Sequence, residues 1–268
     1  MSMLMNRPPE DILPDLPTRE ELQAELLEIP EPPPPPELPD PPGTEDILTA
    51  ALKYVRGRRG ADLLAVILVG SGARRGLTAH SDLNFIVLVK GQDEGEDIVR
   101  VSNRLIHIRY RSQTAVEQEM PHALRLAPLL RKGRVLLDHE AVGAKLVEKA
   151  GQRFRQGPPP AGMNEKIHLK ADCFHRLGKA EDLSHQPATA QYLLNLFLDD
   201  LLQAFFRLKG YWLTSPTDLL RFISTRDAAV GDLLDRAMTA PTLTERLTLS
   251  RQLAHLVFKD IPHPPRVD

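Results

Sequence analysis

The sequence predicts an α/β domain with a mixed sheet over residues 44–157, followed by an all-α helical bundle over residues 158–262. Two observations support this division. Leu63–Val69 is a continuous apolar run, as in a central strand that is buried on both faces. Gly157–Pro160 interrupts the chain, and the segments after it have helical periodicity.

Composition narrows the functional classes. The chain has 268 residues, of which 42% are hydrophobic, and this suits two modest domains. Apolar runs stay well below the roughly 18 residues of a membrane span, so we expect no membrane partner. A single cysteine, Cys173, excludes an internal disulfide and fits a cytoplasmic location. Aromatic residues make up 5% and do not alternate with basic ones, which argues against a nucleic-acid partner.

The N-terminal segment differs from the rest. Residues 1–46 contain 12 acidic and 2 basic residues, whereas the remainder contains 24 acidic and 32 basic ones. We expect residues 1–43 to be a disordered acidic, proline-rich tail, with residues 263–268 as a second tail. A short helix from Thr18 is predicted inside the first tail. We expect this N-terminal tail either to increase solubility or to bind a protein partner. The remainder of the chain is net basic, which is compatible with an anionic ligand.

The first domain is predicted to contain a helix from Thr44 and a short helix from Gly70 to Thr78. Its remaining expected strands and helices are Leu63–Val69, Asp82–Lys90, Arg104–Arg111, Thr114–Arg131, Gly133–His139 and Val142–Arg155. The expected bundle helices are Met163–Ala180, Ala188–Leu208, Pro216–Ser224, Asp227–Thr239 and Leu243–Phe258. The second of these is apolar nearly all round, which predicts the centre of the bundle.

The strand ending at Val69 leads into a candidate phosphate site. It delivers Gly70 and Ser71 to the start of a helix, where glycine lets a phosphate approach the backbone and exposed amides favour an anion. Arg74 and Arg75 follow directly. They either bind a triphosphate or are solvated helix residues.

A second motif follows on the next strand. Asp82 and Asn84 are two residues apart, so their side chains share one face of that strand. The whole pattern, Gly70-Ser71 and then Ser81-Asp82-Leu83-Asn84-Phe85, resembles the polymerase-beta-type nucleotidyltransferase superfamily. The resemblance covers residues 44–140. The helical part that follows matches in general character, because aminoglycoside nucleotidyltransferases also have a helical domain after the nucleotidyltransferase domain.

This resemblance implies a nucleoside triphosphate as ligand or substrate and in-line transfer of its nucleotidyl group. Two magnesium ions clamp the reacting oxygens, held by three carboxylates. It also implies nucleotide binding by the Gly70-Ser71 turn and by Ser81. The sequence departs from the pattern at the metal ligands, where Asp82 matches the first carboxylate and Asn84 replaces the second.

The third carboxylate is expected on the strand Arg104–Arg111, which contains no acid. His107 occupies the position that fits best, and Arg109 shares its face and is expected to contact the nucleotide. The formal charge of the three positions changes from -3 to -1. Magnesium binding by Asp82 and Asn84 is therefore expected to be weak at best.

Three interpretations follow. The first is a pseudoenzyme that keeps the fold and binds a nucleotide or another anion, and we favour it because the fold alone does not establish catalysis. The second is an active enzyme that moves a nucleoside monophosphate to a hydroxyl of a small molecule or protein, with His107 as general base. The third places the missing carboxylate elsewhere, for example at Asp138 or Glu140.

The bundle offers weaker candidates. His168, Asp172 and His175 have metal-compatible helical spacing, although a polar packing face is the simpler interpretation. Tyr211-Trp212 is expected to pack at a helix end. Asp199 and Asp200 interrupt an apolar helix, so at least one needs a partner, either in a cleft or at an arginine.

Overall fold

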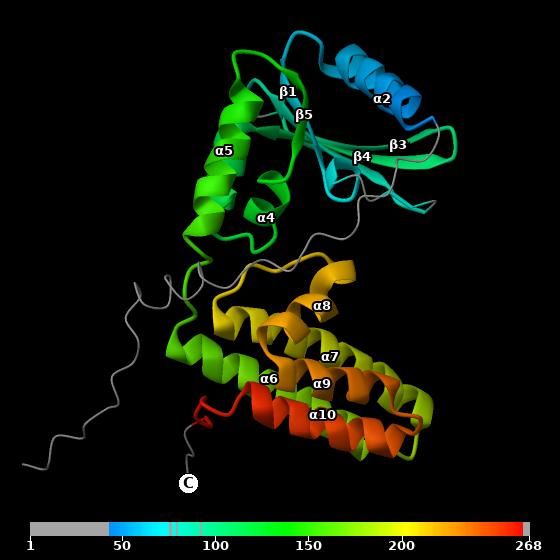
Figure 1. The fold of residues 1–268 in the computed structure, drawn as a ribbon, viewed down its shortest axis with the longest axis vertical. Helices are drawn as coiled ribbons and strands as arrows, with labels where there is room; N and C mark the ends of the chain where they lie inside the picture. Colours follow the sequence, from blue (N-terminus) through cyan, green and yellow to red (C-terminus); the bar gives the residue numbers. More distant parts are fainter. Residues whose placement is uncertain (1–42, 75–76, 79, 92, 265–268) are drawn as a thin grey trace, which may run out of the picture. The chain divides into compact units, whose positions relative to one another are not determined.

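The computed structural model of the chain describes residues 43–74, 77–78, 80–91 and 93–264. Within them, a five-stranded mixed sheet with helices on both faces is followed by an all-helical part (Figure 1). The predicted fold class is confirmed. The predictions made for residues 1–42 and 265–268, including the helix from Thr18, lie outside the described residues.

The sheet has the strand order β3-β4-β2-β1-β5. β2 and β4 are parallel, whereas β1–β2, β1–β5 and β3–β4 are antiparallel. The strands are β1 (Leu63–Val69), β2 (Leu83–Val89), β3 (Gly95–Val101), β4 (Arg104–Ser112) and β5 (Arg134–Asp138). β1 and β2 are buried almost throughout, as expected for apolar strands at the centre of a sheet.

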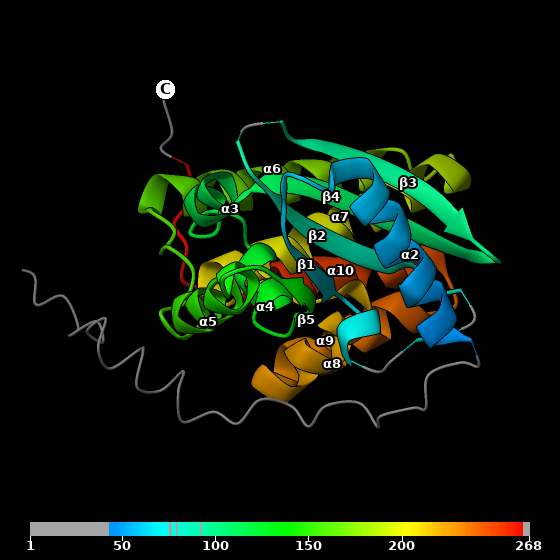
Figure 2. The ribbon, with the colours of Figure 1, turned by 90° about the horizontal axis from the view of Figure 1, so that it is seen from above.

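Helices cover both faces of the sheet. α2 (Thr44–Arg59) places Leu48, Ala51 and Val55 in one core, against side chains from β1, β2 and β4. The opposite core contains residues of three helices, with α4 and α5 on the other side of the sheet from α2 (Figures 1 and 2). These helices are α3 (Gln113–Glu119), α4 (Leu126–Leu130) and α5 (Val142–Arg155).

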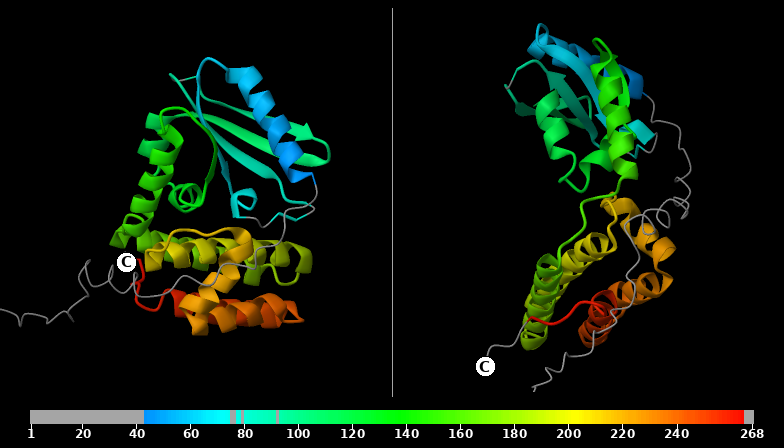
Figure 3. Two further views of the ribbon diagram at one scale, coloured as in Figure 1. Left: turned by 45° about the horizontal axis from the view of Figure 1, so that its top comes forward. Right: turned by 90° about the vertical axis from the view of Figure 1, so that its left-hand side faces the viewer.

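The helical part consists of α6 (Met163–Asp182), α7 (Pro187–Lys209), α8 (Pro216–Arg226), α9 (Ala228–Thr239) and α10 (Leu243–Val257) (Figure 3). α7 contributes Phe197, Leu201 and Phe205 to a core shared with all four other helices. Its predicted central place is confirmed, since an apolar helix lowers its free energy by burying every side. Among the described residues, no helix combines the length and apolar character that crossing a membrane requires.

Two elements differ from the sequence prediction. The helix expected over Thr114–Arg131 is divided into α3 and α4. Pro121 follows the end of α3, and proline cannot donate the backbone hydrogen bond that a continuing helix needs. β3 is not predicted from the sequence, because it is an edge strand with three charged residues and with exposed positions on one face, including Ile98.

The segment between β1 and β2 also differs. The expected helix from Gly70 to Thr78 is represented, among the described residues, by a single 3-10 turn, η1 (Gly72–Arg74). β2 begins at Leu83, so Asp82 lies in the turn before the strand.

Candidate functional site

The turn after β1 has the backbone conformation that the sequence suggests. Gly70 has φ +76°, in the left-handed region that side chains rarely adopt. A Cβ atom at Gly72 would lie 2.9 Å from Leu83 Cδ2, which is too close. Ser71 lies between these two glycines, and its carbonyl accepts from the Arg74 amide at 3.1 Å. The backbone angle therefore favours glycine at position 70, whereas a side chain at position 72 would require the Leu83 and Leu68 side chains to shift.

Asp82 is presented by a tightly bonded turn. The Ser81 amide donates to the Thr78 carbonyl at 3.2 Å, and the Thr78 amide donates to Ser81 Oγ at 2.9 Å. Arg104, at the start of β4, donates from Nη1 to both the Thr78 carbonyl at 3.1 Å and the Ser81 carbonyl at 2.5 Å. The Ser81 hydroxyl thus closes this turn, and Arg104 connects the turn to β4.

The structure brings Asp82, Asn84 and His107 together. Asn84 on β2 is the register partner of His107 on the parallel strand β4. His107 Nε2 lies 3.6 Å from Asp82 Oδ2, and the two side chains are 25% and 44% exposed. The Asn84 amide also borders the turn, since its Nδ2 lies 3.9 Å from where a Cβ atom on Gly70 would be. The three positions that correspond to the carboxylates of the motif therefore form one partly exposed cluster.

This donor set does not fit two magnesium ions. It contains one carboxylate, one neutral amide and one imidazole, whereas magnesium prefers oxygen ligands and two ions require several carboxylates. Among the residues that the structure describes, no group of three or more His, Cys, Asp or Glu side chains is placed to hold a metal ion. Within the described ranges, the loss of acids seen in the sequence is thus not compensated by a further acid at this cluster.

The interpretation that Asp138 or Glu140 supplies the missing carboxylate is wrong. Asp138 pairs with Ala65 near the start of β1, whereas Asn84 pairs with Val69 at its end. The Asp138 carboxylate accepts from the amides at the start of α5, at 2.8 and 3.0 Å. Both acids therefore lie at the opposite end of the central strand from Asp82.

The predicted nucleotide-binding arginines have protein partners. Arg74 donates to Asp218 of α8 at 2.9 Å, a contact that the sequence does not suggest. Arg109 has a 58% exposed side chain on the face of β4 that carries His107, and it donates to Glu96 at 3.4 Å. Arg75 lies outside the described residues. A bound anion would have to compete with the carboxylates of Asp218 and Glu96 for these guanidinium groups.

The Asp218 carboxyl is stabilised in its charged form. Burial raises its pKa, but the hydrogen bond from Ser215 and the bond and charge of Arg74 outweigh this, so the pKa lies below its ordinary value. The Ser215 hydroxyl donates at 2.6 Å. Asp218 is thus a charged partner of the turn after β1.

The lesser candidates in the helical part have structural roles or exposed positions. His168, Asp172 and His175 are exposed on α6 and belong to no metal-binding group within the described part of the chain. Asp199 accepts from Gln203 at 2.8 Å, and Asp200 pairs with Arg176 at 2.6 Å. The expectation that one of the two acids has an arginine partner is confirmed.

Trp212 is packed, as expected for a helix end. Its side chain is buried, and its indole Nε1 donates to the Phe154 carbonyl at 2.9 Å. The ring therefore belongs to the core next to α5 and offers no exposed stacking surface.

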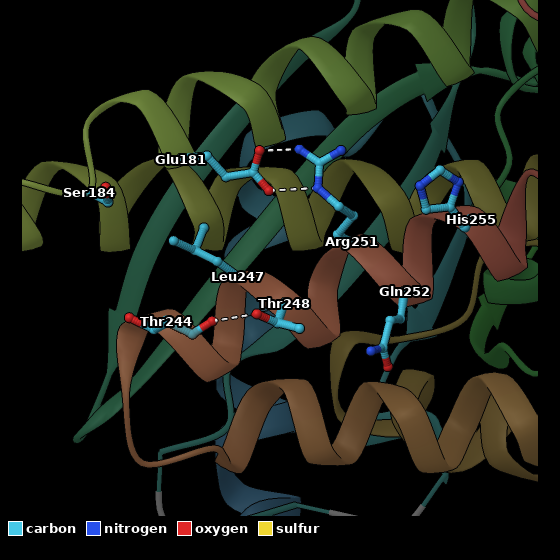
Figure 4. Close-up of a pocket in the computed structure, with 8 residues that line it drawn as sticks. All are labelled: Glu181, Ser184, Thr244, Leu247, Thr248, Arg251, Gln252 and His255. Carbon is cyan, nitrogen blue, oxygen red and sulfur yellow. Dashed lines mark hydrogen bonds and ion pairs between the residues drawn. The ribbon is translucent and has the colours of Figure 1, made fainter.

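A hollow of about 460 Å³ lies between α6 and α10 (Figure 4). Arg251 crosses it to Glu181, with Nε donating at 2.8 Å. The ring of the neighbouring His255 packs on Phe174, with 5.1 Å between the ring centroids. These groups are already engaged with each other, and the hollow contains none of the residues expected at the nucleotide site.

No protein-family description matches the chain, and no curated protein matches it either. Solved structures that resemble it include the crystal structure of a nucleotidyltransferase-like protein from Exiguobacterium sibiricum 255-15. That structure has 13% sequence identity and a TM-score of 0.46, and the match covers 79% of this chain and 74% of that one.

Proposed function

We propose that this chain is a nucleotidyltransferase-superfamily protein with an eroded metal site, which binds a nucleoside triphosphate or a related anion with weak or no catalysis. The observation that supports this proposal is that Asp82, Asn84 and His107 lie close together beside Gly70. A single acid lies in this cluster, where the sequence motif implies three.

Anion binding is assigned to the turn between Gly70 and Gly72. Gly70 adopts a left-handed conformation, and no side chain at this residue or at Gly72 blocks the backbone around Ser71. Successive backbone amides in such turns form concave sites for anions. Arg74 is close enough to donate to the Gly70 carbonyl at 3.4 Å, so its charge lies beside the same turn.

Weak or absent catalysis follows from charge. The three positions carry a formal charge of -1, and a neutral amide is a poorer magnesium ligand than a carboxylate. Without closely held metal ions, the charge that develops on the transferred phosphoryl group is poorly stabilised.

Binding is tested by calorimetric titration of the full chain with ATP, GTP and tripolyphosphate. Gly70→Ala introduces a Cβ atom into the proposed anion site, and Gly91→Ala is its matched control. Both glycines have φ +76°, and a Cβ atom at Gly91 meets nothing within 4 Å. Each variant should lose about 1–2 kcal/mol of stability.

Only Gly70→Ala should also weaken triphosphate binding. No binding of any of the three ligands by the unaltered chain would contradict the proposal. If both variants weakened triphosphate binding equally, the assignment of the anion site to the turn between Gly70 and Gly72 would be contradicted.

A second candidate is an active enzyme that transfers a nucleoside monophosphate to a hydroxyl, with His107 as general base. The distance of 3.6 Å between His107 Nε2 and Asp82 Oδ2 favours it, because it places the candidate base beside the acid that matches the first carboxylate of the motif. Incubation with triphosphates labelled at the α-phosphate tests it. Label transfer that disappears in His107→Ala would support this candidate, and absence of transfer to any hydroxyl acceptor or to the protein itself would count against it.

We also propose a cytoplasmic location and, for residues 1–43, a protein partner. Cys173 is buried as a free thiol, and burial raises its pKa to about 12, so the thiol stays protonated and unreactive.

Deletion of residues 1–43 tests the protein partner proposed for this segment. A partner that the full chain captures and the shortened chain loses supports the proposal, and a partner that both chains retain opposes it.

A further inference from the structure

The outer edge of β3 is open to pairing with a further strand. β3 is an edge strand of the sheet, and within the described residues no strand pairs with its outer side (Figure 2). Its seven residues, Gly95–Val101, include no proline and no lysine, and their pairing with β4 runs without a bulge. Proline, lysine and bulges are features with which proteins commonly block an exposed strand edge. The backbone of β3 is thus available to another strand.

The alternation of the ladder with β4 determines which backbone groups of β3 point outward. A two-residue turn joins Val101 to Arg104, so these two residues form the hydrogen-bonded pair that closes the hairpin. Hydrogen-bonded and non-hydrogen-bonded pairs alternate from there along an antiparallel ladder. The amides and carbonyls of Glu96, Ile98 and Arg100 therefore point away from β4.

The side chains of the same three residues lie on the open face of the sheet. Ile98 is 60% exposed at the middle of β3, and Leu105, the register partner of Arg100 on β4, is 44% exposed. The core on this face contains residues of β1 and β2 but none of β3 or β4. Glu96 accepts from Arg109 at 3.4 Å, whereas Arg100 makes no ion pair with another described residue. The edge thus exposes an apolar centre between an acid and a base.

This order of residues is complementary to itself. In an antiparallel pair of two copies of β3 centred on Ile98, each Glu96 lies opposite Arg100 of the second copy, and Ile98 lies opposite Ile98. These residues direct their backbone groups outward, so each of these pairs is a hydrogen-bonded one. Arg100 gains the acid that it lacks in a single chain, and Glu96 then lies between two arginines, its own Arg109 and Arg100 of the second copy.

Other two-fold registers of the same edge are less favourable. A pair centred on Asp97 places two carboxylates opposite each other, and a pair centred on Arg100 does the same with two guanidinium groups. Like charges directly opposite each other destabilise a sheet. A pair centred on Val99 places Ile98 opposite Arg100 and joins no opposite charges within the strand. The register centred on Ile98 is therefore the one that the charges select.

We propose that two copies of this chain form a homodimer by antiparallel pairing of Gly95–Val101 about a two-fold axis at Ile98. The two five-stranded sheets become one continuous sheet. Two-fold dimers are the commonest homo-oligomers, and each copy contributes the same surface to such an interface. The interface also lies one strand from the proposed nucleotide site, because Ile98 is the register partner of His107.

Charge reversal in the full chain tests this interface, with sedimentation velocity over a concentration series as the measure of the dimer dissociation constant. Glu96→Arg and Arg100→Glu each place like charges opposite each other at both ends of the paired strands. Each should raise the dissociation constant at least about tenfold, because two attractive cross-strand pairs become repulsive. Glu148→Arg, at an exposed residue of α5, is the matched control and should leave the constant unchanged. Circular dichroism establishes that each variant is folded.

An equimolar mixture of Glu96→Arg and Arg100→Glu tests the register itself. In a mixed dimer the two altered positions lie opposite each other, and so do the two unaltered ones, so both contacts again join opposite charges. The mixture should dimerise with a dissociation constant within about threefold of that of the unaltered chain. The Ile98 amide of the unaltered chain should also exchange more slowly as the protein concentration rises, because dimerisation gives this amide a hydrogen-bond acceptor.

An unaltered chain that stays monomeric up to about 100 μM would overturn the proposal. A dimer that neither charge reversal weakens would overturn it as well, as would a mixture that associates no more tightly than either variant alone. These measurements are made without nucleotide, so their outcome is independent of the titrations that test the proposed function.

Discussion

The Arg74 guanidinium donates to the Asp218 carboxylate over 2.9 Å and thereby ties the turn after β1 to the first turn of α8. Asp218 also accepts from the Ser215 hydroxyl at 2.6 Å and from Arg221 at 3.0 Å. Its side chain is 17% exposed, and that of Arg74 is 31% exposed. A contact with the helical part thus fixes a residue beside the proposed anion site.

This contact predicts a pH dependence of stability. The pKa of Asp218 is lowered in the folded chain, so folding favours the ionised carboxylate. The stabilisation is present above the ordinary pKa of about 4 and is lost as the pH falls through the lower, folded value. Asp218→Asn should be less stable than the unaltered chain at pH 7, and this difference should shrink below about pH 4. Urea denaturation between pH 7 and pH 3 measures it.

Asp232→Asn on α9 is the control for this series, because the side chain of Asp232 is 72% exposed. Its stability should follow that of the unaltered chain at every pH, since exposed ion pairs contribute little. A stability loss in Asp218→Asn that stays constant down to pH 3 would show that the charge of Asp218 is not its cause.

Arg104 is predicted to hold the turn that presents Asp82. Arg104→Ala removes two hydrogen bonds to the carbonyls of Thr78 and Ser81. We expect a loss of about 1–3 kcal/mol in unfolding free energy and faster hydrogen exchange at the amides of Thr78 and Ser81. Arg100→Ala, at an exposed residue of β3, is the comparison and should leave these amides protected. If the amides of Thr78 and Ser81 exchanged equally fast in both variants, Arg104 would not be the residue that holds this turn.

Trp212 is predicted to be a major contributor to stability. Trp212→Ala removes a buried indole together with its hydrogen bond to the Phe154 carbonyl, which keeps the Gly157 amide as a donor at 3.1 Å. We expect a loss of about 3–5 kcal/mol in unfolding free energy. Because Trp212 is the single tryptophan of the chain, circular dichroism has to follow the unfolding of this variant. A loss below about 1 kcal/mol would mean that the indole is not well packed.

Much of the fold follows from local patterns. Burial of β1, β2 and α7 is predicted from their apolar sequences, because such segments are stable only in the interior of a domain. Alternation along β4 correctly places His107 on the face opposite to Ile106 and Ile108, which are both fully buried.

The remaining features depend on contacts that local patterns do not encode. Arg74 and Asp218 are 144 positions apart, and neither belongs to a motif that indicates the other. Arg104 is one arginine among many, and its two carbonyl partners are backbone atoms without a sequence signature. The edge strand β3 has a polar composition because one of its sides remains unpaired.

The central claim is that the site retains too few acids to depend on magnesium. It is tested most directly by ATP calorimetry with and without magnesium, in the unaltered chain and in a variant that restores the acids, Asn84→Asp with His107→Asp. We predict that magnesium changes the affinity of the unaltered chain by less than about threefold and raises that of the restored variant by at least about tenfold, or about 1.4 kcal/mol. ATP binding by the unaltered chain that appears only with magnesium and is lost in Asp82→Ala would contradict the claim.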